Sequence, residues 1–279
     1  MIVDCHTHVF PPAIAKDRER YVDSDPTFAE LYASPDAKLA SADNLVRSMD
    51  AGGIDVSVAL GFAWSDPETC RLHNDYLLEA AAASNGRIVP FPTLPLTSAP
   101  EAIEEEARRC IAAGAMGFGE LRPDNLNFDL SGEDGACLAR IASELDAVLL
   151  FHVTEPAGHA YPGKHGLALT SFYAFVSAHP EVKVIGAHWG GGLPFYASMP
   201  EVRALPNLRV DTAASSLLYD DAVYRRVIEL TGPAMVLFGS DYPLLSQSRS
   251  RRRIEEAGLQ PAACDLILGG NAAALLGLT

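Results

Sequence analysis

Short runs of apolar and β-branched residues alternate along this chain with longer segments whose apolar positions recur at helical spacing. The short runs predict strands at residues 2–8, 54–61, 88–93, 116–121, 148–153, 182–188, 208–212 and 235–240. The longer segments predict helices at residues 42–51, 68–84, 100–113, 135–145, 169–178, 194–204, 221–230, 251–257 and 262–276. Strands that alternate with helices in this way predict right-handed βαβ units and a parallel sheet.

Eight βα units predict an α/β fold of the (β/α)8 TIM barrel type, and 279 residues suit a single domain spanning 1–279. An open, doubly wound sheet is the competing fold. That fold predicts a glycine-rich phosphate loop after the first strand, where this chain has His-Thr-His-Val-Phe-Pro-Pro instead. Residues 11–38 are polar and contain proline, and we interpret them as a long first βα loop that covers the barrel mouth.

The composition suits a globular protein and argues against some partners. Hydrophobic residues make up 48% of the chain and charged residues 20%, which allows a sizeable core. The formal net charge of -15 opposes binding to nucleic-acid phosphates. The basic run 249–253 is better explained by a solvated helix on which Arg251 pairs with Glu255 and Arg252 with Glu256.

Five cysteines are scattered without a C-x-x-C spacing, which indicates neither a disulfide framework nor a cysteine zinc site. The first strand candidate begins at residue 2 and leaves no room for a secretion signal, and no apolar run is long enough to span a bilayer. We therefore expect a cytoplasmic protein that acts on a small molecule, with neither nucleic acid nor membrane as a partner. The sequence does not decide whether the protein is a monomer or a homo-oligomer.

The first predicted strand ends in His6-Thr7-His8. Successive side chains of a strand point to opposite faces, so His6 and His8 share one face, with Asp4 behind them. Two imidazoles at this spacing can hold one metal ion.

Other predicted strands also end in chemically active residues, namely Glu120, His152, His188 and Asp241. Each has a structural alternative: Glu120 could pair with Arg122, the histidines could be core or turn residues, and Asp241 could cap a turn. Independent accidents would not place all of them at the face where barrel enzymes build active sites. Imidazoles and a carboxylate are the ligands that a divalent ion of zinc type prefers, and such an ion activates water.

Five segments carry a family resemblance: Asp4-Cys5-His6-Thr7-His8, Phe151-His152, Ala187-His188-Trp189-Gly190-Gly191, Gly239-Ser240-Asp241-Tyr242-Pro243 and Gly270-Asn271-Ala272-Ala273-Ala274-Leu275-Leu276. Together they resemble the amidohydrolase superfamily, and within it the "amidohydrolase 2" group of metal-dependent TIM-barrel enzymes. Relatives in this group include aminocarboxymuconate-semialdehyde decarboxylase. The segments run from residue 4 to residue 276, so the resemblance covers nearly the whole chain.

The resemblance implies that His6, His8, His152 and Asp241 hold one divalent ion, Zn2+ first and Mn2+ as the alternative. His188 would stand beside the activated water, and Asp241 would also accept its proton. Binuclear relatives often carry a carbamylated lysine on the fourth strand, where this chain has Glu120. Glu120 could bridge two ions with His188 on the second, or act as a general acid or substrate contact; we favour one ion.

Substrate recognition rests on residues beside these groups. Arg122 could bind a substrate carboxylate through two hydrogen bonds, and Trp189 could flank a planar ring. Lys164, His165 and Tyr161 are explained at least as well by loop packing and solvated charge.

Two enzymatic hypotheses share this ligand set. The first is a metal-dependent hydrolase that cleaves a lactone, a cyclic amide or a similar small molecule with metal-activated water. The alternative is a non-oxidative decarboxylase of a small carboxylated substrate on the same metal site. A TatD-type nuclease fits the acidic charge poorly, and the intact His188 and Asp241 argue against an inactive, metal-stabilised binding protein.

Overall fold

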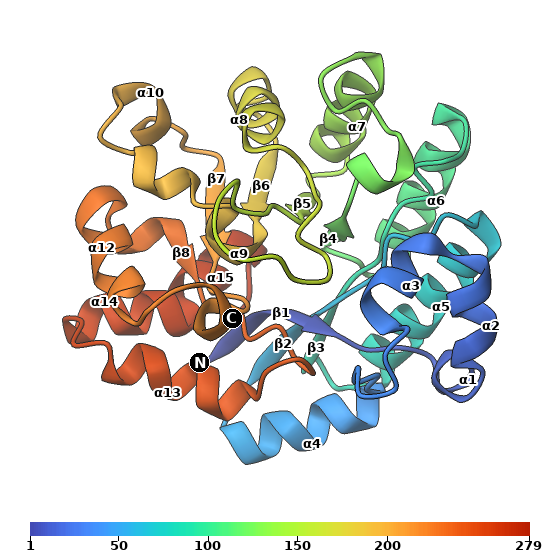
Figure 1. The fold of residues 1–279 in the computed structure, drawn as a ribbon, viewed down its shortest axis with the longest axis horizontal. Helices are drawn as coiled ribbons and strands as arrows, with labels where there is room; N and C mark the ends of the chain where they lie inside the picture. The colour runs from blue at the N-terminus through green and yellow to red at the C-terminus, as the bar shows by residue number, and fades with distance from the viewer.

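The computed structural model describes residues 1–279 and arranges parallel strands around one axis, with helices outside them (Figure 1). The strands are β1 (Val3–His8), β2 (Val56–Leu60), β3 (Ile88–Phe91), β4 (Gly117–Leu121), β5 (Val148–Phe151), β6 (Lys183–Gly186), β7 (Leu208–Asp211) and β8 (Val236–Leu237). Each of them lies within one of the predicted ranges, because strands buried on both faces read as nearly continuous apolar runs.

Hydrogen bonds close these strands into a barrel. Ladders pair the strands in the orders β1-β2-β3 and β4-β5-β6-β7-β8. Between the first set and the second, the Gly119 N–H donates to Pro92 O just beyond β3 at 3.0 Å. Between the last strand and the first, the Cys5 N–H donates to Phe238 O at 2.7 Å and the Asp241 N–H donates to His6 O at 2.9 Å. These contacts confirm the predicted (β/α)8 fold.

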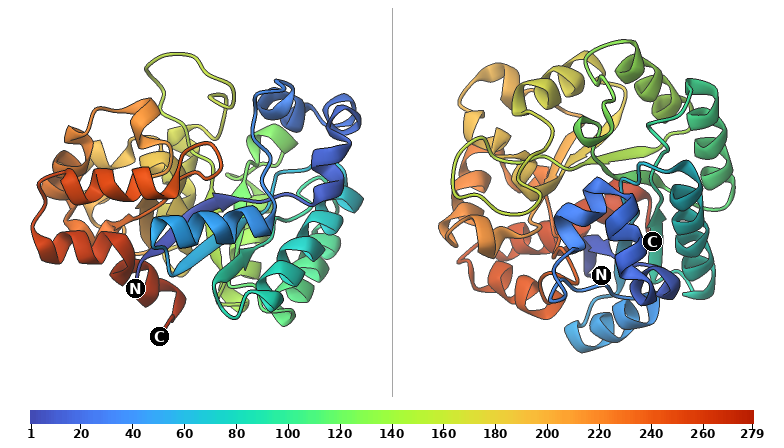
Figure 2. Two further views of the ribbon diagram at one scale, coloured as in Figure 1. Left: turned by 90° about the horizontal axis from the view of Figure 1, so that it is seen from below. Right: turned by 45° about the vertical axis from the view of Figure 1, so that its right-hand side comes forward.

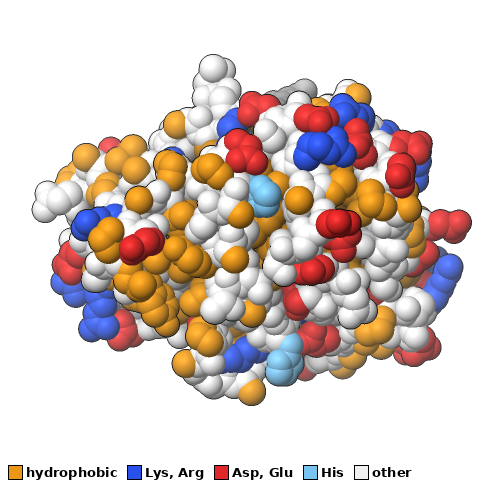
Figure 3. All heavy atoms as spheres, turned by 90° about the horizontal axis from the view of Figure 1, so that it is seen from above, with side chains coloured by type: hydrophobic (Ala, Val, Ile, Leu, Met, Phe, Trp, Pro, Cys, Tyr) orange, Lys and Arg blue, Asp and Glu red, His pale blue; other side chains and the backbone are white.

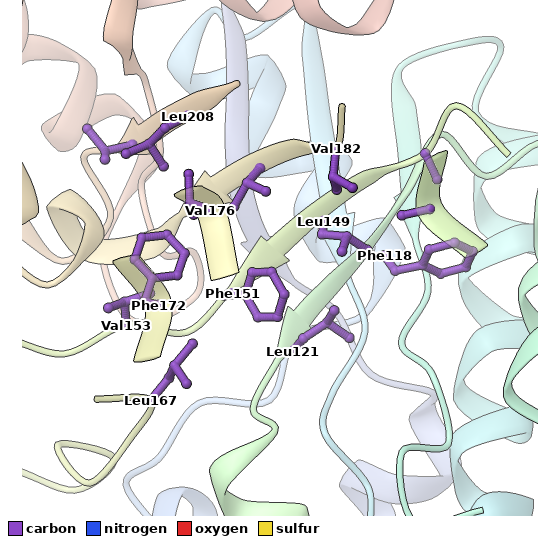
Figure 4. Packing of buried hydrophobic residues seen from close by; sticks show 14 of the residues in the cluster. Phe118, Leu121, Leu149, Phe151, Val153, Leu167, Phe172, Val176, Val182 and Leu208 are labelled. Carbon is purple, nitrogen blue, oxygen red and sulfur yellow. The ribbon is translucent and has the colours of Figure 1, made fainter. Parts of the chain in front are cut away.

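The strands separate two apolar layers. Inside the barrel, side chains such as Val58 and Leu150 belong to a cluster of 13 buried hydrophobic residues. Outside it, alternate strand residues pack against the helices in a cluster of 50 buried residues. Figure 4 shows Phe151 of β5 beside Phe172 of the helix that follows, with ring centroids 6.1 Å apart. Full burial of one such side chain contributes about 1.5–3 kcal/mol, so both layers hold the strand ends firmly in place.

Seven outer helices follow the predicted ones to within four residues at either end. They are α4 (Ala42–Gly52), α5 (Pro67–Ala83), α6 (Pro100–Ala112), α7 (Glu133–Glu144), α8 (Leu169–Ala178), α12 (Ala222–Thr231) and α13 (Gln247–Glu256). The shorter helical segments η1 (Asp124–Leu126), α9 (Ala187–Gly190), α11 (Ser215–Leu218) and η3 (Pro233–Met235) lie in the connections.

Two predicted helices are interrupted. The segment 194–204 divides into η2 (Leu193–Tyr196) and α10 (Pro200–Arg203). Pro200 has no N–H to donate and disfavours a helical conformation in the residue before it, so one helix cannot run through. The segment 262–276 stays helical but contains a π-helical turn, η4 (Leu266–Gly270), between α14 (Pro261–Asp265) and α15 (Asn271–Leu276).

The predicted long first βα connection at 11–38 lies between β1 and α4, and it contains three short helices that were not predicted, α1 (Pro12–Lys16), α2 (Arg18–Ser24) and α3 (Pro26–Tyr32). Its polar composition concealed three apolar anchors, Ile14, Tyr21 and Phe28, all of them buried. They join an apolar cluster with Trp64 and three further residues, separate from the barrel core. Figure 2 shows the three helices rising on the same side of the barrel as the loop that follows β5.

No helix combines the length and the apolar character that crossing a lipid bilayer requires. The face in Figure 3 carries acidic, basic and apolar side chains intermixed, without a continuous basic area. The predicted pair between Arg251 and Glu255 is present on α13, with Nε and Oε1 2.9 Å apart.

Candidate active site

Six predicted residues meet inside the carboxyl end of the barrel, and all six are buried. Their donor atoms form three overlapping groups, each within 4.8 Å: His6, His8 and Glu120; His6, His188 and Asp241; and Glu120, His152 and His188. The rule that chemistry collects at carboxyl ends of barrel strands therefore brings the right side chains together.

The two histidines of β1 reach this cluster because the strand contains an irregularity. Val3 and Cys5 belong to the apolar cluster inside the barrel, and pairing with β2 shifts register between Asp4 and Thr7. This shift reverses the alternation of side chains, so that His6 and His8 join the cluster instead. Asp4, predicted to lie behind the histidines, accepts a hydrogen bond from the backbone N–H of His6 at 3.2 Å but has no hydrogen bond to either imidazole. Its carboxylate accepts hydrogen bonds from Ser240 Oγ at 2.6 Å and from Gln247 Nε2 of α13 at 2.9 Å.

Three of the four imidazoles are held by one ring nitrogen and present the other to the cluster. His6 Nδ1 donates to Asp211 Oδ2 at 2.8 Å, and His152 Nε2 donates to Gly163 O at 2.8 Å. His188 Nδ1 donates to Ala213 O at 3.3 Å. Metal-binding histidines are typically oriented in this way, since the outer hydrogen bond fixes the ring and its tautomer.

The inner donor atoms lie close to one another. His6 Nε2 and His8 Nε2 are 3.1 Å apart, and Asp241 Oδ1 is 3.7 Å from each of them. Glu120 Oε1 lies 2.9 Å from His152 Nδ1 and 3.3 Å from His188 Nε2. Imidazole nitrogens and carboxylate oxygens are the donors that zinc and manganese bind, so the residues present fit a divalent ion.

The ionisable groups of the cluster shift one another's pKa values. Burial opposes ionisation of Glu120, but His152 and His6 outweigh it and hold the pKa of this carboxyl well below its usual range. Burial also works against protonation of His6, yet Asp211 and Glu120 raise its pKa to about 10. Burial and the neighbouring His6 lower the pKa of His8 to about 4. His8 is therefore neutral at pH 7, and its Nδ1 is buried without a hydrogen-bond partner.

Two residues of the cluster sit on unusual backbone. His188 has a φ of 55° and Asp241 a φ of 65°, in the left-handed region that residues other than glycine rarely adopt. Such positions concentrate at functional sites, where surrounding structure holds them. The glycines after His188 continue the turn: Gly191 has a φ of 62°, and a Cβ there would lie 2.8 Å from Thr154 O. The turn beside the site therefore requires glycine at this position, because a side chain would meet the backbone of Thr154.

Arg122, the predicted carboxylate-binding residue, is buried and stands two residues after Glu120 of the cluster. Its Nη2 donates to His165 O at 2.8 Å and lies 3.5 Å from Glu30 Oε2. Its Nε and Nη1 are buried and have no hydrogen-bond partner. A buried donor without a hydrogen-bond partner costs about 1–3 kcal/mol of folding free energy, so this guanidinium can donate favourably to an anionic oxygen.

The prediction that Trp189 flanks a substrate is wrong. Its indole is 0% exposed and belongs to the core outside the barrel strands, where Nε1 donates to Ser215 Oγ at 2.7 Å. At Trp189 φ is 60°, so its side chain does not follow the alternation of the preceding strand and points into the outer core instead. Lys164 also has a structural role, since its Nζ lies 3.2 Å from Glu155 Oε1 and donates to two loop carbonyls.

Sequence analysis missed two residues that organise the site. Asp211 is 0% exposed; besides receiving the His6 hydrogen bond, its Oδ1 accepts from the backbone N–H groups of His188 and Ala213, each at 3.0 Å. It ends β7, so the strand-end rule applied to Glu120 could have found it. Glu30 had no such signal, because it lies on α3 within the predicted long first loop and not at a strand end.

Comparison with known proteins agrees with this fold. The sequence profile of the amidohydrolase family matches residues 3–278. A curated relative, 2-amino-3-carboxymuconate-6-semialdehyde decarboxylase of Dictyostelium discoideum, is 23% identical over 99% of this chain and 91% of its own length.

Two solved structures share the fold. 2,6-Dihydroxybenzoate decarboxylase in complex with 2,6-dihydroxybenzoate has a TM-score of 0.77 at 20% identity, covering 99% of each chain. 5-Carboxyvanillate decarboxylase of Novosphingobium aromaticivorans, in complex with manganese and 4-hydroxy-3-methoxy-5-nitrobenzoic acid, has a TM-score of 0.78 at 17% identity. That alignment covers 100% of this chain and 96% of the other.

Proposed function

This chain belongs to the amidohydrolase family, and on that premise we propose that it is a metal-dependent, non-oxidative decarboxylase of small carboxylated aromatic compounds. The observation that carries the proposal is the buried Arg122, which stands two residues after Glu120 of the cluster of metal-type ligands and has two donors, Nε and Nη1, without a partner. The guanidinium of Arg122 can bind a substrate carboxylate while the ligand cluster binds a divalent ion. The decarboxylases found among the relatives support this alternative over the hydrolase that the sequence first suggested.

We propose that His6, His8, His152 and Asp241 hold the ion, with Glu120 adjoining them. When bound, a divalent ion supplies positive charge that attracts substrate oxygens and stabilises negative charge developing on them. The manganese in the 5-carboxyvanillate decarboxylase structure favours Mn2+ over the Zn2+ expected from the sequence. Six donors are also enough for two ions sharing Glu120, so metal stoichiometry of the purified protein decides between one and two.

Loss of carbon dioxide leaves its bonding electrons on the substrate carbon, which must then receive a proton. We propose that His188 delivers it. Both nitrogens of this ring face acceptors, Ala213 O and Glu120 Oε1, each at 3.3 Å. Burial works against the charged ring, but Glu120 outweighs it and raises the pKa of His188 above its ordinary value. With an acceptor at each nitrogen, the ring is suited to carry this proton.

The proposal is tested with a panel of hydroxylated benzoates and metal-loaded protein. We expect carbon dioxide release, and in D2O a product with deuterium at the carbon that lost its carboxyl group. Arg122→Met removes a charged hydrogen bond worth about 1.5–3 kcal/mol and should raise KM roughly 10- to 100-fold. Turnover of no carboxylated compound in the panel, or an unchanged KM in Arg122→Met, would contradict the proposal.

Metal-dependent hydrolysis is the second candidate, and the position of Glu120 favours it. This carboxylate lies among four imidazoles, where it could serve a second ion or a water molecule. Hydrolysis would transfer oxygen from labelled water into the product and release no carbon dioxide. The same assay therefore separates the two reactions.

A further inference from the structure

The candidate site is closed from above by two segments far apart in sequence. His8, Glu120, His152, His188 and Asp241 are each no more than 9% exposed. One covering segment is α3, and the other is the loop of residues 155–166, which we call the cover loop. Figure 1 shows this loop crossing the centre of the view, and Figure 2 shows it beside α1–α3.

A single hydrogen bond joins α3 to the cover loop. The Gly163 N–H donates to Glu30 Oε1 at 2.9 Å. Leu31 adds an apolar contact, since its Cδ2 lies 2.8 Å from the position that a Cβ on Gly163 would take. The backbone of Gly163 is thus fixed from both sides, because its carbonyl receives the hydrogen bond from His152.

The other oxygen of the same carboxylate faces Arg122. Glu30 Oε2 lies 3.5 Å from Nη2, the nitrogen that also donates to His165 O in the cover loop. One carboxylate therefore links α3, the end of β4 and the cover loop. With Nη2 anchored at two points, the remaining donors of the planar guanidinium, Nε and Nη1, have a fixed direction.

We propose that Glu30 is a positioning residue, which holds the cover loop on the site and fixes Arg122 for a carboxylated ligand. Without Glu30, Gly163 loses the acceptor for its N–H and Arg122 loses its charged partner. The loop then opens more often, and the guanidinium no longer meets a carboxylate in one geometry. The part of this inference that concerns a ligand rests on the proposed function; the part that concerns the loop does not.

The test compares Glu30→Ala and Glu30→Gln in the metal-loaded protein. A glutamine oxygen can still accept from Gly163, so Glu30→Gln should restore the contact with the loop, while its amide nitrogen faces Arg122 Nη2 and leaves Arg122 without its charged partner. Glu19→Ala is the matched control, because it deletes one exposed carboxylate of the same segment that forms no ion pair. Circular dichroism verifies that each variant folds.

Hydrogen exchange of the peptide covering residues 155–166 is the first measurement. We expect Glu30→Ala to speed exchange about tenfold at Gly163 and its neighbours, and the glutamine variant and the control to stay within twofold of wild type. Equal exchange in Glu30→Ala and wild type would overturn the proposal, whatever reaction the protein performs.

Affinity for 2,6-dihydroxybenzoate and for resorcinol, which lacks the carboxyl group, is the second measurement. We expect both Glu30→Ala and Glu30→Gln to weaken binding of the carboxylated ligand about tenfold and binding of resorcinol less than twofold, because neither variant offers Arg122 a charged partner. A gain in affinity for 2,6-dihydroxybenzoate would show that Glu30 competes for Arg122 and would overturn the positioning role. If wild type binds neither compound, the proposed substrate class fails, and the exchange measurement alone decides the role of Glu30 in holding the loop.

Discussion

Replacing Asp211 by asparagine tests the outer hydrogen bonds of the proposed metal site. Asparagine has the same shape and keeps an oxygen for the backbone N–H groups of His188 and Ala213. Its amide nitrogen, however, replaces the oxygen that accepts from His6 Nδ1 at 2.8 Å. Two donors then face each other, so the imidazole is driven to carry its proton on Nε2, the nitrogen that points into the cluster.

The magnitude follows from that change of partner. Removing the residue that orients a metal-binding histidine typically costs 10- to 100-fold in metal affinity, or about 1.4–2.7 kcal/mol. A proton forced onto the binding nitrogen adds to this cost. We therefore expect Asp211→Asn to bind Mn2+ at least tenfold more weakly than wild type, measured by competition with a chromophoric chelator.

Asp4→Asn serves as the matched control for this experiment. Asp4 is equally buried on β1, but its side chain contacts Ser240, Gln247 and backbone rather than an imidazole. Both variants should lower the melting temperature, and only Asp211→Asn should lower metal affinity by a large factor. Metal affinity within twofold of wild type in Asp211→Asn would refute the orienting role.

Three further outcomes are expected. His188→Asn should keep the ion and lose turnover about 10²- to 10⁴-fold, as measured by metal analysis and kcat; loss of the ion would instead make His188 a metal ligand and favour two ions. Trp189→Phe should destabilise the protein by about 1–3 kcal/mol in urea unfolding with KM unchanged, because its indole hydrogen bond to Ser215 is structural; a raised KM would speak against this. Burial lowers the pKa of His73 from 6.5 to about 4, so the folded state favours the neutral ring. The folded state is therefore not destabilised by His73 above pH 6.5 and loses at most about 3 kcal/mol as the pH falls towards 4. His73→Gln should flatten this fall of the unfolding free energy in acid, and an unchanged fall would show that another group causes it.

The sequence predicted the barrel well, and it selected candidate site residues that lie together, where local signals coincide with burial. Buried strands read as apolar runs, and His152, His188 and Asp241 were found because each ends such a run. Asp211 obeys the same rule and could have been found by it.

The remaining differences arise from three-dimensional effects that no short window contains. The register shift in β1 turns the carboxylate of Asp4 toward Ser240 and away from the imidazole of His6, although simple alternation predicts a shared face. The positive φ at Trp189 sends a residue beside the site into the core. The helix containing Glu30 depends on three widely spaced apolar anchors that only a tertiary partner makes visible.

The seam between β8 and β1 has a consequence for how this protein is made. His6 and His8 lie near the beginning of the chain and Asp241 near its end, and the Asp241 N–H is hydrogen-bonded to His6 O across that seam. A ribosome incorporates His6 and His8 long before it reaches Asp241. The proposed metal pocket is therefore incomplete until Asp241 has been synthesised, and full-affinity ion capture reports that the segment after β8 has docked against β1.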